Sequence, residues 1–383
     1  MKIIGLTFLF GFAAAQTVLA SLNLLPAGKM GVPADDVLEY EELADLIHEY
    51  NAEVINSRLE YDDYRGKSND DFRNTYSEMA DRLEDSSDRM MDGINEDEPG
   101  YGAAEASAMS IRLQAEQARD QADMENEDGR VKKLEYDRQE ALLIQKAQGL
   151  MIEYWKKEKE RPALERALQQ AEAEVQAARR KAALGMLSQL ELLEAEAAVC
   201  TAQAAEASGK TKQEELRRQL IVMTGWQYDD MPRLGEIPIP EEALPEKTDP
   251  ESDRTQALAA NFSLAADRRR LENTDSGTAK DVLNQKVEAG QQKIEADIEA
   301  KYNSLMQAQT DYGQAKEEYR LAEEKLEADE RRYQLGLLSA NDRMAAQAEL
   351  SSKKAAWEIS GLSFRQAYED YQWAVEGLAA YEG

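Results

Sequence analysis

The chain of 383 residues has a single cysteine, Cys200, and a single histidine, His48. One cysteine excludes a disulfide framework, an iron–sulfur cluster and a zinc site built from cysteines. One histidine leaves little room for a His-rich metal site or for a proton relay. We therefore predict no catalytic residues, no bound metal and no cofactor, and we do not expect an enzyme.

Basic residues are scarce relative to acidic ones. There are 46 Lys and Arg against 76 Asp and Glu, which gives a net charge of −30. Nucleic-acid binding depends on basic contacts to phosphates, so a nucleic-acid partner is excluded. The abundant Ala, Glu, Gln, Lys and Leu are typical of long helices rather than of several globular domains.

The first 20 residues predict an export signal. Lys2 precedes a largely apolar run, and Val18 and Ala20 occupy the positions before a small-residue cleavage site. The run is shorter than the roughly 20 apolar residues that span a bilayer, which disfavours a membrane anchor. We expect cleavage after residue 20 and an exported mature protein in the cell envelope.

Prolines gather in one segment near the middle of the chain. Five of the nine lie between Trp226 and Pro250. Because proline breaks helices, the segment 228–250 is predicted to connect two helical halves. Pro162 stands apart from these and is expected to interrupt a long helical pattern in the first half.

The second half carries large apolar and aromatic residues at intervals of seven. A seam sustained over this length is typical of a coiled coil. The helix would run from about Val282 to Leu335 and would be about 80 Å long. The seam residues are Ile298, Leu305, Tyr312, Tyr319, Leu326 and Tyr333.

The two halves are related by an internal duplication. Residues 179–188 match 330–339 around Gly185 and Gly336, which are 151 residues apart. The same offset of 151 aligns apolar residues spaced by seven in the first half with the seam residues of the second half. Asn51 and Asn261 begin a second match with an offset of 210, so the first half is 59 residues longer. We assign this excess to an acidic, helical segment at about 67–129.

In each half the glycine ends one long helix and a Leu-Ser pair precedes the next. Ser188 and Ser339 are predicted N-caps, because a hydroxyl can accept the free amide hydrogens of a first turn. Glu191 and Asp342 follow three residues later, as in a capping box. Each half therefore predicts a helical hairpin, whose tip is either a plain turn or an exposed surface that meets a partner.

These duplicated hairpins resemble the TolC-type outer-membrane efflux proteins. A helix ending in Arg-Arg-Tyr-Gln-Leu-Gly-Leu-Leu-Ser, followed by an Ala/Glu/Gln-rich return helix, is similar to the hairpins of that family. The two repeats would span 36–227 and 251–378. The resemblance implies an all-α fold of long antiparallel coiled-coil hairpins in two tandem repeats, the protomer of a trimeric α-helical barrel.

The resemblance also implies partners and site residues. The hairpin tips would dock on a periplasmic adaptor (a membrane fusion protein) that works with an inner-membrane pump, and exported substrates would pass through the oligomeric channel. The family often places acids six and nine residues after the second tip glycine, at a closed aperture. The implied tip residues are Gly185, Leu187, Ser188, Gly336, Leu338 and Ser339, and the implied aperture acids are Glu191, Glu194 and Asp342.

The sequence departs from the family in one respect. Transmembrane strands should alternate apolar and polar residues over about ten positions. The segment 273–280 is too short for a strand pair, and 67–130 has a helical pattern instead, so the sequence shows no evident β-barrel. Two hypotheses follow: a TolC-like efflux duct component, or a non-conducting coiled-coil scaffold of the cell envelope.

Overall fold

Long α-helices form most of the chain. The computed structural model describes residues 37–92, 97, 99–245, 248–275 and 277–382, so the predicted signal peptide at 1–20 lies outside the described residues. The predicted all-α class is confirmed. The helices of the first half are α2 (Leu43–Tyr50), α3 (Ala52–Tyr64), α4 (Asn69–Met91), α5 (Tyr101–Met124), α6 (Gly129–Ala183) and α7 (Gln189–Met223). Those of the second half are α8 (Pro250–Ala260), α9 (Phe262–Asn273), α10 (Thr278–Gln334), α11 (Ala340–Trp373) and the π-helix η3 (Ala374–Leu378).

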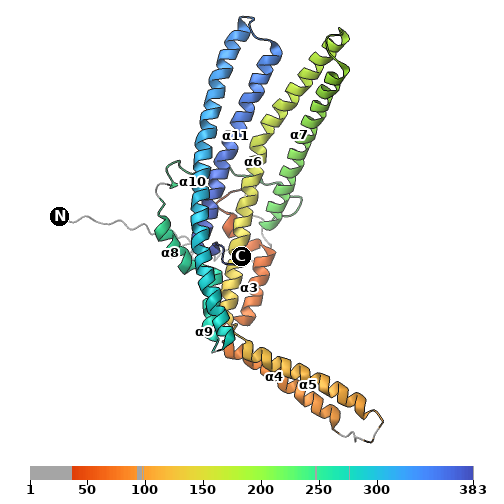
Figure 1. Ribbon diagram of the computed structural model, residues 1–383, viewed down its shortest axis with the longest axis vertical. Coiled ribbons are helices and arrows are strands. Elements are labelled where there is room, and N and C mark those ends of the chain that lie inside the picture. The colour runs from red at the N-terminus through yellow and green to blue at the C-terminus, as the bar shows by residue number, and fades with distance from the viewer. Residues whose placement is uncertain (1–36, 93–96, 98, 246–247, 276, 383) are drawn as a thin grey trace, which may run out of the picture. The chain divides into compact units, whose positions relative to one another are not determined.

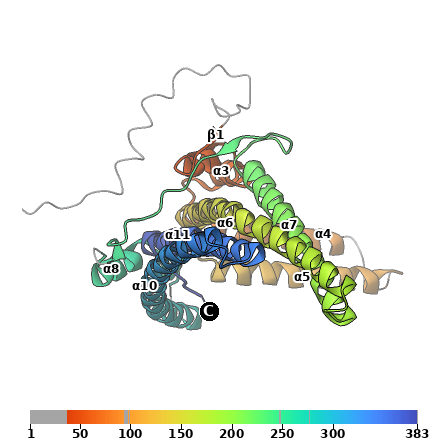
Figure 2. The same ribbon diagram turned by 90° about the horizontal axis from the view of Figure 1, so that it is seen from above.

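The four longest helices pack side by side in the order α10, α11, α6, α7 (Figure 1, Figure 2). α6 and α7 form one antiparallel hairpin, α10 and α11 form the other, and α11 packs on α6 between them. Figure 1 shows both hairpin turns at the same end of these helices. No helix within the described ranges is both long and apolar enough to cross a membrane.

The heptad seam of α10 faces α11. Ile298 is buried, and farther toward the tip the aromatic rings of the two helices stack on each other. The ring centroids of Tyr312 and Phe364 are 6.1 Å apart, and those of Tyr319 and Trp357 are 5.2 Å apart. The interval of seven residues therefore marks the contact between the two arms of a hairpin, as a coiled-coil seam should.

One asparagine in each half begins a helix and also ties it to the end of that half. Asn51 caps α3 with its side-chain oxygen and donates from Nδ2 to the Met223 carbonyl over 3.0 Å. Asn261 caps α9 and donates to the Ala379 carbonyl over 2.9 Å. The residues matched by the offset of 210 thus make matching contacts, which supports the inferred duplication.

Two hydrophobic cores hold the short helices against the long ones. The first joins α2 and the start of the described chain to α6 and α7, and the second joins α8 and α9 to α10, α11 and the last residues. Prominent members of the first core are Leu38, Leu43, Ile47, Met151, Ile152 and Leu220. Prominent members of the second are Leu264, Ile294, Ile298, Phe364, Tyr371 and Tyr381.

The proline-rich connector is fastened to the first half by backbone bonds. Its strand β2 (Arg233–Leu234) pairs in parallel with β1 (Val37–Leu38). Just beyond, the Gly235 N–H donates to the Leu38 carbonyl over 2.9 Å. The Gly235 carbonyl in turn accepts from the Trp155 indole of α6 over 2.8 Å. The connector therefore runs as an extended strap across α6.

The expected interruption at Pro162 is wrong. Pro162 lies inside α6, which continues from Gly129 to Ala183. A proline removes one backbone hydrogen bond and crowds the preceding turn. Here the packing of α6 along both α7 and α11 maintains the helix through that local loss. Gly313, which the offset of 151 residues matches to Pro162, likewise lies inside α10.

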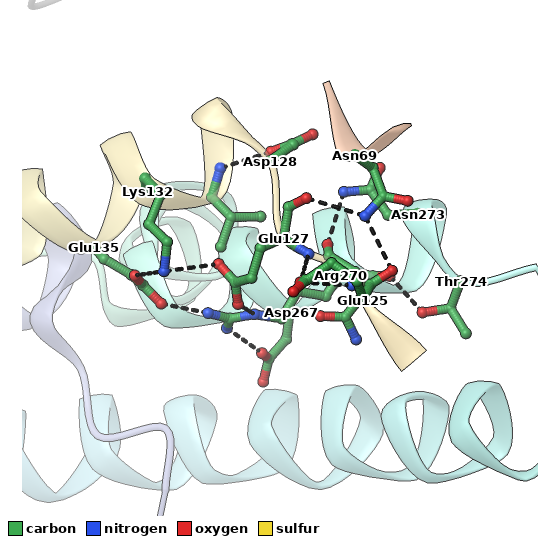
Figure 3. A network of polar contacts seen from close by, with 12 residues as sticks. Asn69, Glu125, Glu127, Asp128, Lys132, Glu135, Asp267, Arg270, Asn273 and Thr274 are labelled. Atoms are coloured by element: carbon green, nitrogen blue, oxygen red, sulfur yellow. Dashed lines mark hydrogen bonds and ion pairs between the residues drawn. The ribbon is translucent and has the colours of Figure 1, made fainter. Parts of the chain in front are cut away.

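The acidic segment at 67–129 contains α4 and α5, which pack on each other as an antiparallel pair (orange in Figure 1). A network of ion pairs joins the base of this pair to α9 (Figure 3). Arg270 of α9 lies 2.8 Å from a Glu127 carboxylate oxygen and 2.8 Å from one of Asp267, and it also pairs with Glu135. Glu127 belongs to the short link between α5 and α6, so these contacts anchor the pair where it leaves the long helices.

Asp267 is the most deeply buried acid of this network. Its side chain is 2% exposed. Burial by itself raises the pKa of Asp267, but hydrogen bonds from Lys286, Arg270 and Tyr381 outweigh it and hold that pKa below its ordinary value. The carboxylate is therefore charged at neutral pH and fully engaged with its partners.

Candidate functional site

Each hairpin tip begins with a helix end closed by a glycine. Gly185 follows α6 with a φ of 71°, and Gly336 follows α10 with a φ of 73°. The Gly185 N–H donates to the Ala182 carbonyl over 2.9 Å, and the Met186 N–H donates to the Lys181 carbonyl over 2.9 Å. This pair of bonds is a Schellman motif, which requires a left-handed residue that glycine adopts without a Cβ penalty.

The second tip repeats this geometry. The Gly336 N–H donates to the Tyr333 carbonyl and the Leu337 N–H to the Arg332 carbonyl, each over 2.9 Å. Apart from its own chain neighbours, neither tip glycine has another heavy atom within 4 Å of the position that a Cβ would occupy. Backbone conformation, and not crowding, is therefore the reason for glycine at both tips.

The return helices begin at the predicted caps. The Ser188 hydroxyl accepts from the Glu191 N–H over 3.2 Å, and a Glu191 carboxylate oxygen accepts from the Ser188 N–H over 2.8 Å. At the second tip the Ser339 hydroxyl accepts from the Asp342 N–H over 3.1 Å and donates to its carboxylate over 2.6 Å. Both capping predictions are confirmed, and the full reciprocal capping box forms at the first tip.

The three predicted aperture acids differ in their hydrogen-bond partners. The Ser188 hydroxyl and backbone N–H hydrogen-bond to the Glu191 carboxylate and hold its pKa below the ordinary value. Asp342 is exposed and is also engaged by its own cap. Glu194 is exposed one turn farther along α7. Two of the three acids thus have a structural role as cap partners, beside any role at an aperture.

The apolar surface of the tips lies mainly on residues that the sequence analysis did not select. Leu187 and Leu338 are only partly exposed. The residues flanking each glycine are far more exposed: Leu184 74%, Met186 72%, Leu335 73% and Leu337 68%. A Schellman turn projects these neighbours outward, and the helical register carried to the glycine could have identified them. Each tip therefore exposes two large apolar side chains beside its glycine.

One arginine near each tip links the two arms of its hairpin. Arg179 of α6 donates to the Glu196 carboxylate of α7 over 2.9 Å. Arg343 of α11 donates to the Glu330 carboxylate of α10 over 2.8 Å and lies over the Tyr333 ring at 4.8 Å. Exposed ion pairs of this kind stabilise weakly, so they chiefly fix how the arms align.

Comparison with known proteins identifies the architecture. No family model matches the chain, and no curated protein matches it in sequence. Among solved structures, the CmeC outer membrane channel of Campylobacter jejuni superposes with a TM-score of 0.54 at 10% identity, over 90% of this chain and 87% of CmeC. The outer-membrane channel OprN gives 0.54 at 12% identity, over 88% and 90%. The outer membrane protein VceC of Vibrio cholerae gives 0.50 at 11% identity, over 90% and 97%.

The chain has the TolC-type fold. The resemblance inferred from the duplicated tips is thereby confirmed at the level of fold. CmeC and OprN are outer-membrane channels. Within the TolC-type fold, the tips described above are the hairpin ends at which α6 turns into α7 and α10 into α11.

Proposed function

We propose that this protein is an exported component of a TolC-like efflux duct in the cell envelope. Three copies form an α-helical channel, and exported substrates pass through it. The tips dock on a periplasmic adaptor that connects the duct to an inner-membrane pump. The proposal rests on the TolC-type fold together with the tip surfaces of this chain.

The duplicated tip is the observation that carries the proposal. Leu184 with Met186 and Leu335 with Leu337 present the same kind of apolar pair beside the same left-handed glycine. A chain of net charge −30 could readily place charged residues on such exposed turns. Large apolar side chains there are instead suited to contact with another protein.

Conduction needs no chemistry from the protein. A duct acts through the width of its channel and through the electric field of the residues that line it. Three copies of the mature chain, each near −31 after the loss of Lys2, would make a strongly acidic assembly. Glu194, together with the cap partners Glu191 and Asp342, would lie near the tip end of such a channel. These acids would favour the passage of cations over anions.

A second candidate is a non-conducting scaffold of the envelope. It is favoured by the segment 67–129, which adds the antiparallel helical pair α4–α5 to the chain. A scaffold would use the long helices for assembly and would not need open passage at the tips. The two candidates differ in whether export depends on the tip residues.

The test is a double substitution at the tips, Leu184→Glu with Leu335→Glu. Both side chains are highly exposed, so the fold should be retained. Under the duct proposal, affinity for the purified periplasmic adaptor should fall at least about tenfold, and export should not be restored in cells that lack the gene. Leu59→Glu with Val282→Glu, at leucine and valine side chains of α3 and α10 that are 63% and 58% exposed, is the matched control and should behave as wild type. Undiminished adaptor binding and export in the double variant would contradict the tip assignment and favour the scaffold.

A further inference from the structure

A cavity lies between the proline-rich connector and the long helices. Its volume is about 230 Å³, and residues of α6, α10, α11 and the connector line it. Part of the lining is aliphatic, from Ile237 and Ile239 of the connector and Leu362 of α11. Because an apolar cavity of roughly 150 Å³ can bind benzene, this cavity has room for a single aromatic ring with a small substituent.

Three aromatic side chains also line the cavity, and contacts with other residues hold each of them in place. Trp155 of α6 is held by the hydrogen bond from its indole to the Gly235 carbonyl. Tyr312 of α10 and Trp357 of α11 belong to the ring stacks that join those two helices. A ligand would therefore meet aromatic rings that are already ordered, which lowers the entropic cost of binding.

The charged residues of the cavity are two acids and one base. The base, Lys159 of α6, lies over the Trp155 ring with its Nζ 5.6 Å from the ring centroid, in a cation–π contact. Glu236 of the connector and Glu358 of α11 make neither an ion pair nor a hydrogen bond within the part of the chain that the structure describes. The lining thus has a net charge of −1, and it is the two carboxylates that lack a partner.

We propose that this cavity binds a small aromatic cation, in which an ammonium or quaternary nitrogen is attached to a single ring. The aromatic and aliphatic lining would contact the ring, and the carboxylates of Glu236 and Glu358 would attract the positive charge. The net charge of −30 on the whole chain adds to that attraction. An anion of the same size would instead be repelled by both carboxylates.

The cavity lies within one copy of the chain, so the inference does not rest on the proposed duct. A ligand in it would contact the connector together with helices of both halves. Because such a ligand binds the folded chain and not the unfolded one, it should also raise the thermal stability of the protein. Failure to bind would leave the duct proposal intact.

The first experiment varies the charge and the ring of the probe. Isothermal titration calorimetry of the full mature chain compares benzyltrimethylammonium with phenylacetate, which carries a ring and a negative charge, and with tetramethylammonium, which has the charge but no ring. We expect benzyltrimethylammonium to occupy one site per chain and to bind at least about tenfold more tightly than either of the others. Equal affinity for phenylacetate would overturn the role of the carboxylates. Equal affinity for tetramethylammonium would reveal only a general attraction of cations to an acidic chain, and would also overturn the proposal.

The second experiment removes one carboxylate with little change of shape. Glu358→Gln should raise the dissociation constant of benzyltrimethylammonium about three- to tenfold, because one partner of the cation is neutralised. Binding of the uncharged probe benzyl alcohol should stay within about twofold of wild type, which shows that the cavity is intact. Glu116→Gln is the matched control, since it makes the same change of charge at an exposed acid of α5. Equal effects of the two substitutions on the cation would overturn the proposal.

Tryptophan fluorescence gives an independent readout of the position of the ligand. Trp155 and Trp357 line the cavity and are two of the four tryptophans of the chain. Binding of benzyltrimethylammonium should change the intrinsic emission over the same concentration range as the calorimetric titration. Unchanged emission at saturation would place the ligand away from both rings and contradict the proposed site.

Discussion

The substitution Asn261→Ala tests whether the repeated asparagine is a major stabilising device of each half. Asn261 is 1% exposed, and its side chain makes two bonds at once. The amide oxygen accepts from the Leu264 N–H over 2.9 Å, and the amide nitrogen donates to the Ala379 carbonyl over 2.9 Å. Alanine removes both bonds.

The expected cost follows from these two contacts. Loss of an N-cap costs about 1 kcal/mol. Leaving the Ala379 carbonyl buried and without this donor costs a further ~1–3 kcal/mol, because Ala379 is itself only 4% exposed. The free energy of unfolding should therefore fall by about 2–4 kcal/mol. Urea unfolding of the mature chain, followed by circular dichroism, measures the change.

Two further substitutions serve as comparisons for Asn261→Ala. Asn51→Ala should fall in the same range, because Asn51 makes the equivalent bonds in the first half. Ser188→Ala removes a cap on an exposed turn and strands no buried partner, so its cost should stay near 1 kcal/mol. If Asn261→Ala is no more destabilising than Ser188→Ala, the tie to the end of each half contributes nothing, and the reasoning is refuted.

Two further predictions concern charged groups. Arg270→Met should lower the free energy of unfolding by about 2–3 kcal/mol. This is less than the usual cost of breaking a buried ion pair, because Asp267 keeps other partners. A change under ~0.5 kcal/mol in urea unfolding would count against a stabilising role of the network. Ser188→Ala should raise the pKa of Glu191 toward its ordinary value, while Ser339→Ala should leave it unchanged. The sign is fixed because the folded-state pKa of Glu191 is lowered, so the stabilisation is present above the unfolded-state pKa and is lost as pH falls through the folded value. NMR titration of the glutamate carboxyl signals would detect the shift, and an equal response to both variants would contradict it.

Features that repeat along the chain could be predicted from the sequence. The seam of α10, the two Schellman turns and the serine caps all depend on short-range periodicity or on local backbone rules. The offset of 210 residues pairs Asn51 with Asn261, but it does not predict the hydrogen bond that each asparagine donates to the far end of its half. Local chemistry and duplication therefore identified the class of fold and the positions of the tips.

Features that depend on packing could not be predicted in the same way. Pro162 should break an isolated helix, but α6 is held along both sides by neighbouring helices. Leu184 and Leu335 are residue types usually found in cores, and their exposure becomes predictable only when the turn at the following glycine is taken into account. The network around Arg270 joins residues more than 130 positions apart, because α9 contacts Glu127 in the link before α6 and Glu135 within α6. No local sequence pattern predicts such contacts.

The central claim is that three copies of this chain form one duct. Native mass spectrometry of the purified mature protein tests it most directly, because it counts the chains in each assembly. The account predicts a dominant species of three chains that persists in the presence of the adaptor. A dominant single chain at micromolar concentration, with or without the adaptor, would contradict it.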